Sequence, residues 1–162
     1  MPAALPVLTP TQRAALIVVL TALAYALALA LSLWFIPYIA GLIVAVGLAS
    51  GVAAMSSMRF GLPGVLGVLL GAFVGYARVV SPDLAFMLAC AAAAGAGLMG
   101  YLAHRLAPFS LALDYVASVA KFTLVIAPLG SAATAALGVL GLHALGLLDT
   151  SQVLQALWVG WM

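Results

Sequence analysis

Charge is what this sequence has least of. Only 5% of the 162 residues are Asp, Glu, Lys or Arg, glutamate is missing, and hydrophobic residues make up 68%. A soluble domain carries about 25% charged residues, so this chain could not cover its surface in water. The composition therefore predicts an integral membrane protein. The length of its apolar runs predicts a single all-α domain, a polytopic bundle of transmembrane helices.

Cysteine and clustered charge are also scarce. Cys90 is the single cysteine, which excludes an intramolecular disulfide, argues against a cysteine-based metal site and favours a small buried packing residue. The five basic residues are scattered, so no nucleic-acid-binding patch is expected. Paired carboxylates, a Ser–His–Asp set and a phosphate loop are missing. We therefore expect no enzymatic activity from this chain, and no metal or cofactor.

What is abundant is apolar sequence of membrane-spanning length. About 20 helical residues cross a hydrocarbon core of about 30 Å. The runs predict five full spans, over about residues 14–35, 37–56, 61–77, 84–102 and 121–147, and a sixth that starts near residue 151. The stretches between them, such as MSSMRF and RVVSPD, are interpreted as short linkers with no room for a soluble module. Thr11 is expected to cap the first helix.

Two spans contain irregular features. Pro128, Leu129 and Gly130 fall inside the fifth, where they predict either a kinked helix or a break into two half-helices. The sixth run ends at Met162 after about 15 Å, half of a hydrocarbon core. This length predicts that the span is truncated.

The basic residues also predict an orientation. If the helices alternate, Arg13, Arg59 and Arg105 lie on one side of the membrane and Arg78 on the other. Positive residues favour the cytoplasmic side, so the N-terminus is predicted to be cytoplasmic.

Rare polar and aromatic residues are the candidates for a site. Asp114 and Lys121 are two helical turns apart and share a face, as a functional charge pair or as residues that reach the headgroups. His143 is either titratable near neutral pH or a polar interface residue. The tryptophans suit an aromatic belt or a cavity wall. The candidates for a signal pocket or for coupling are Trp34, Pro37, Asp114, Lys121, Pro128, Gly130, His143, Trp158 and Trp161.

Glycines form a stripe in the third span. Gly64, Gly67, Gly71 and Gly75 fall on one helical face, where the missing side chains let another helix approach closely. The stripe indicates either packing within one protomer or a homodimer face.

Several stretches in order resemble the bacterial membrane-associated sensor family, type one of the MASE group. They are MRFGLPGVLGVLLGAFVGY at 58–76, LDYVASVAKFTLVIAPLGSAATAALGVLGL at 113–142, and the tryptophan-rich LWVGWM at the end. A family motif after the first span is kept here in a stretched form, LWFIPYIAG, with Trp34 and Pro37.

The resemblance implies a sensory input domain in the bacterial inner membrane. Such a domain relays an unidentified small-molecule signal to a fused cytoplasmic histidine kinase or diguanylate cyclase, and the last span continues toward it. The alternatives are a small solute transporter, such as a vitamin-binding transport subunit, and a scaffold subunit that holds partners in the membrane.

Overall fold

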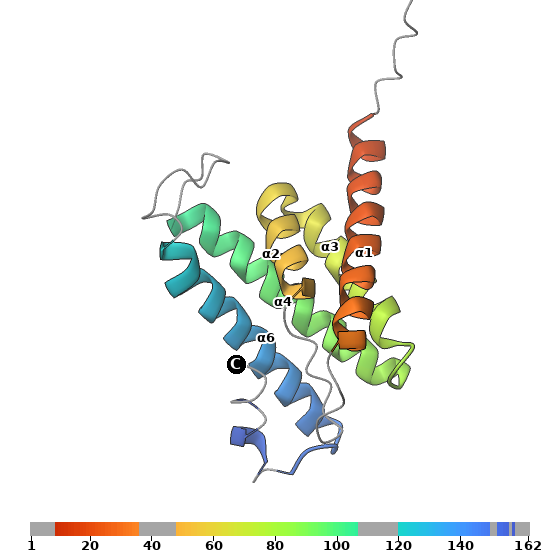
Figure 1. Ribbon diagram of the computed structural model, residues 1–162, viewed down its shortest axis with the longest axis vertical. Helices are drawn as coiled ribbons and strands as arrows, with labels where there is room; N and C mark the ends of the chain where they lie inside the picture. The colour runs from red at the N-terminus through yellow and green to blue at the C-terminus, as the bar shows by residue number, and fades with distance from the viewer. Residues whose placement is uncertain (1–8, 36–47, 107–119, 150–151, 156, 158–162) are drawn as a thin grey trace, which may run out of the picture.

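The computed structural model describes residues 9–35, 48–106, 120–149, 152–155 and 157. These residues form helices and turns, and no strand occurs among them. The elements are α1 (Pro10–Phe35), α2 (Leu48–Phe60), α3 (Leu62–Tyr76), α4 (Pro82–Leu106), the π-helix η1 (Phe122–Ile126) and α6 (Ala127–Ala144). Figure 1 shows α4 in the middle of the bundle, with α6 on one side and α1 on the other.

Three helices of the described residues are long and apolar enough to cross a membrane. They cover Pro10–Ser32, Pro82–Arg105 and Phe122–Ala144, which correspond to the first, fourth and fifth predicted spans. The coarse prediction of an all-helical membrane protein is supported at these three positions. Five full spans are not established.

The second and third predicted spans differ from the helices that form. Residues 37–47 of the second lie outside the described residues, and α2 continues through MSSMRF to Phe60, so interpreting that stretch as a linker was wrong. Helix α3 has 15 residues, which is about 22 Å and short of a full crossing. Gly61, with a φ of 61°, separates α3 from α2, and a turn follows α3 after Tyr76.

The cap of the first helix lies two residues earlier than predicted. The hydroxyl of Thr9 accepts a hydrogen bond from the Gln12 amide at 3.3 Å, and the Gln12 side chain accepts one from the Thr9 amide at 3.0 Å. This reciprocal pair is a capping box. Pro10 occupies the first helical position, where its missing N–H costs nothing. The prediction of Thr11 as the cap was therefore wrong.

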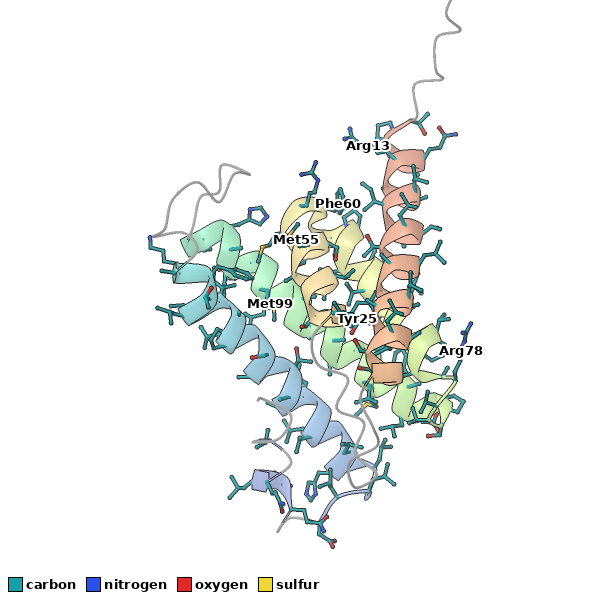
Figure 2. The ribbon with its side chains drawn as sticks, viewed as in Figure 1. Arg13, Tyr25, Met55, Phe60, Arg78 and Met99 are labelled. Atoms are coloured by element: carbon teal, nitrogen blue, oxygen red, sulfur yellow. The ribbon has the colours of Figure 1, made fainter. Side chains whose placement is uncertain are left out.

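Glycine contacts fix the directions of the helices. Gly67, Gly71 and Gly75 lie against Thr21, Ala22 and Leu29 in turn, so α1 and α3 run parallel. Helix α4 runs antiparallel to α3 and to α6, because Phe73 meets Phe86, and Gly130 and Gly141 meet Met99 and Met87. The described helices therefore alternate in direction. Figure 2 shows Arg13 and Phe60 toward one end of the bundle and Arg78 toward the other.

Small side chains fill the core between α1, α2, α3 and α4. Alanines contribute most of it, around the fully buried Leu29 and Val68. The buried hydroxyls of Ser32, Ser56 and Ser57 donate to carbonyls three or four residues earlier in their own helices. Small residues of this kind allow close helix approach in lipid, where apolar surface gives no drive for association.

Candidate functional site

The fifth predicted span is one continuous helix with a widened turn before Pro128. Residues 120–144 are helical throughout, and the amide of Ala127 donates to the carbonyl of Phe122, five residues earlier. Pro128 has no N–H, and its ring would clash with the carbonyl four residues back. One extra residue in the preceding turn makes room for the ring. The break into two half-helices is therefore wrong, and the distortion is a π-bulge.

On the Pro128 side of the bulge, α4 and α6 approach closely at two glycines. A Cβ at Gly130 would collide with the Met99 side chain, and one at Gly95 would collide with the Thr134 hydroxyl. The Thr134 hydroxyl donates to the Gly130 carbonyl at 3.0 Å, so it is satisfied within its own helix. We call this contact between α4 and α6 the α4–α6 seam.

Between the seam and the Lys121 end of the bundle, one hydrophobic cluster joins three helix ends. We call it the Met99 cluster; its members are Ala54 and Met58 from α2, Met99, Leu102 and Ala103 from α4, and Phe122 and Ile126 from η1. Ile126 is 0% exposed and Ala103 1%, so the π-bulge is anchored from its inner side. Figure 2 shows Met99 on α4 between α2 and α6.

The candidate residues on η1 and α6 do not converge on one pocket. Lys121 is exposed at one end, Pro128 and Gly130 lie about two turns inside, and His143 is exposed at the far end. At about 1.5 Å per residue, Lys121 and His143 lie about 33 Å apart along the axis. A single site containing both is therefore incompatible with this helix.

His143 organises the end of α6. Gly146 has a φ of 70°, its amide donates to the His143 carbonyl at 3.0 Å, and the Leu147 amide donates to the Leu142 carbonyl at 3.0 Å. These two bonds form a Schellman motif. The His143 Nδ1 lies 2.9 Å from the Leu148 carbonyl, and since a carbonyl can only accept, Nδ1 carries the proton. His143 thus ties the outgoing chain to the helix.

The glycine stripe of α3 is covered within the same chain. Gly64 lies against the backbone of Ser56 in α2, and Gly67, Gly71 and Gly75 lie against α1. Gly64, Gly67 and Gly71 are buried by these contacts. Of the two interpretations of the stripe, the structure places it in packing within one protomer, since a second copy would have to displace α1.

A polar contact between α1 and α3 was missed in the sequence. The side chains of Tyr25 and Tyr76 hydrogen-bond to each other, and Tyr25 is 4% exposed. Thr21, Tyr25 and Ser32 are all buried on α1. Their spacing of four and seven residues places them on one face of α1. This polar face was missed because hydrophobicity was averaged over the whole span.

The remaining site candidates lie outside the described residues. They are the side chain of Trp34, and Pro37, Asp114, Trp158 and Trp161. Among the residues that are described, no group of three or more His, Cys, Asp or Glu side chains is placed to hold a metal. No protein-family model, curated protein sequence or solved structure matches this chain.

Proposed function

We propose that this chain is a membrane-embedded sensory input domain of the membrane-associated sensor type, relaying a signal to a cytoplasmic kinase or diguanylate cyclase module. The observation that carries the proposal is where the family-like motifs fall. In the stretch 58–64, Gly61 makes the α2–α3 turn at positive φ, Pro63 enters the first turn of α3, and Gly64 lies against the α2 backbone. Gly61 and Gly64 thus occupy positions that favour glycine, and Pro63 occupies a first-turn position where proline is well accommodated.

The second family-like stretch gives the proposal a physical route for coupling. Pro128 accompanies the π-bulge, and Gly130 accepts the Met99 side chain at the α4–α6 seam. A π-bulge is a local choice of helix register, and a seam of small residues allows the two helices to pack in more than one way. A signal that binds one packing better than the other shifts the balance between them.

The finer topology belongs to the same proposal. It includes five full spans, a sixth that continues beyond Met162, and a cytoplasmic N-terminus in the bacterial inner membrane. This topology would place an output module in the cytoplasm, where its nucleotide is. Support comes from the alternating helix directions and from the three helices of spanning length.

The parent gene tests the proposal most directly. We expect the reading frame to continue past codon 162 through further apolar sequence into a histidine kinase or diguanylate cyclase module. A stop codon there, together with a native mass of 16.4 kDa, would remove the effector and defeat the proposal.

In the longer protein, the seam supplies a functional test. Gly130→Leu forces α6 away from Met99, whereas Gly138→Ala adds a Cβ that meets only Leu88 at 3.9 Å. We expect the first variant to change basal output severalfold and the second to leave it near the wild-type level. Equal output from both variants, in protein that is inserted at normal levels, contradicts coupling through the seam.

The transporter alternative is less well supported by the described helices. Many transporters bind substrate at broken helices near the bilayer midplane. Here residues 120–144 form an unbroken helix, and Lys121 is exposed at its end. Solute uptake by the isolated chain that is abolished by Lys121→Ala would nevertheless favour transport over sensing.

A further inference from the structure

Three exposed cations adjoin the Met99 cluster at one end of the bundle. They are Arg59 near the end of α2, Arg105 near the end of α4, and Lys121 immediately before η1. The cluster members nearest to them in sequence are Met58, directly before Arg59, Ala103, two residues before Arg105, and Phe122, directly after Lys121. Because these members pack together, the cluster holds the three cationic helix ends side by side. Figure 1 shows the ends of α2 and α4 and the start of the last long helix at the same end of the molecule.

Each cation stands one helical turn above an exposed apolar or aromatic side chain. The pairs are Met55 with Arg59, Tyr101 with Arg105, and Leu124 with Lys121, and the first members are 69%, 58% and 75% exposed. Residues three or four apart share a face of an α-helix, so the faces of α2 and α4 that carry Arg59 and Arg105 are cationic at the tip and apolar just below. Leu124 lies in the π-turn, three residues after Lys121. A phospholipid has the complementary form, with a phosphate at the surface and acyl chains beneath it.

Both arginine side chains lie over aromatic rings of their own helices. The Arg105 guanidinium lies 5.5 Å from the centre of the Tyr101 ring, and that of Arg59 lies 5.9 Å from the centre of the Phe60 ring. Cation–π contacts of this length restrict the guanidinium while leaving its N–H groups able to bind an anion.

The charges elsewhere favour an anion at this end. Among the described residues, the carboxylates are Asp83 and Asp149, and both lie at the opposite end of the bundle together with Arg78. The described charges at the end that carries Arg59, Arg105 and Lys121 are therefore all positive.

We infer that Arg59, Arg105 and Lys121 form a binding site for the headgroup phosphate of an anionic phospholipid. The two guanidinium groups offer paired N–H donors to the phosphate oxygens, and the lysine adds a point charge. The exposed apolar side chains one turn deeper contact the acyl chains. This inference requires only that the helices lie in a membrane, and it does not depend on a signalling role.

Titration of the purified full chain with fluorescent phosphatidylglycerol, in uncharged detergent micelles at low salt, tests the site. A basic residue at an anionic surface changes affinity by about fivefold, so Arg59→Gln/Arg105→Gln/Lys121→Gln should bind about a hundredfold more weakly. The control Arg78→Gln removes a charge at the opposite end of the bundle. It should bind within about twofold of the wild type, because the site is left intact.

Several results would overturn the inference. The triple variant could bind with wild-type affinity, or the control could lose as much affinity as the triple variant. The wild type could bind phosphatidylcholine equally tightly, or millimolar inorganic phosphate could displace the lipid. If circular dichroism shows that the triple variant is not folded, Lys121→Gln replaces it, since that side chain is exposed. The single variant should lose about fivefold, and unchanged affinity would equally refute the site.

Discussion

At the scale of single residues, glycine decides how closely the helices pack. A Cβ on Gly71 would lie 2.5 Å from the Ala22 carbonyl oxygen of α1, and backbone cannot move aside as a flexible side chain can. Around Gly51 in α2, by contrast, nothing lies within 4 Å of the added carbon. The two glycines look equivalent in the sequence and differ only in what faces them.

This contrast predicts opposite effects of the same substitution. Gly71→Ala should destabilise the protein by about 1–3 kcal/mol through overpacking. Gly51→Ala should be neutral or stabilising by up to about 1 kcal/mol, since alanine favours a helix. Denaturant unfolding in mixed micelles, followed by circular dichroism, measures both. Equal stability of the two variants would mean that α1 does not lie against Gly71.

Backbone conformation separates two other glycines. Gly61 has φ 61° and ψ −131°, a region open essentially to glycine, so Gly61→Ala and Gly61→Asn should each cost about 1–3 kcal/mol. Gly146 has φ 70° in a Schellman motif, where asparagine is tolerated. Gly146→Asn should therefore be milder than Gly146→Ala. Thermal unfolding of the four variants checks the ranking, and an asparagine that rescues position 61 but not 146 would contradict it.

At the scale of elements, Pro128 explains why η1 exists. A proline in a regular α-helix removes one hydrogen bond and crowds the carbonyl four residues earlier. The π-turn at Phe122–Ile126 relieves the crowding, and it also sets which side chains face α4. Ile126 is 0% exposed and Leu124 75% in this register.

Removing the proline should therefore rotate the start of the helix. With Pro128→Ala the turn can return to α-geometry, and the loss of one extra residue turns the segment before it by about 100°. In a Cys90→Ser background, Leu124→Cys should react with a maleimide faster than Ile126→Cys, and Pro128→Ala should reduce that contrast. If the difference in rates is unchanged, something other than Pro128 maintains the bulge.

At the scale of the whole molecule, alternating helices separate the charges. Arg13, Arg59, Arg105 and Lys121 lie at one end, and Arg78 lies at the other. The positive-inside rule then favours a cytoplasmic location for the first end.

Thiol labelling in intact cells tests this orientation. In a Cys90→Ser background, we expect Ser81→Cys to react with a membrane-impermeant maleimide from outside the cell. His104→Cys should react only after the cells are permeabilised. Both positions are exposed in the structure, so a difference in reaction reports the side of the membrane. The reverse pattern would invert the orientation and place the basic end outside.

The sequence by itself determined the class of protein and the long helices. Composition and hydrophobic length suffice to predict a helical membrane protein, because a bilayer requires apolar side chains over about 20 residues. The helices α1, α4 and η1–α6 fall where the apolar runs predict them. The ends of the helices are predicted less well, since Thr9 rather than Thr11 caps α1 and α2 continues to Phe60.

Only the tertiary structure decided which faces meet. A glycine stripe on one helix shows that something comes close, and it does not say whether α1 or a second copy fills the space. The Tyr25–Tyr76 contact and the Met99 cluster likewise depend on residues far apart in the chain. Lipid-facing and partner-facing positions are both apolar in a membrane helix, so hydrophobicity cannot distinguish them. Steric fit between specific side chains does, and it exists only once the helices are packed.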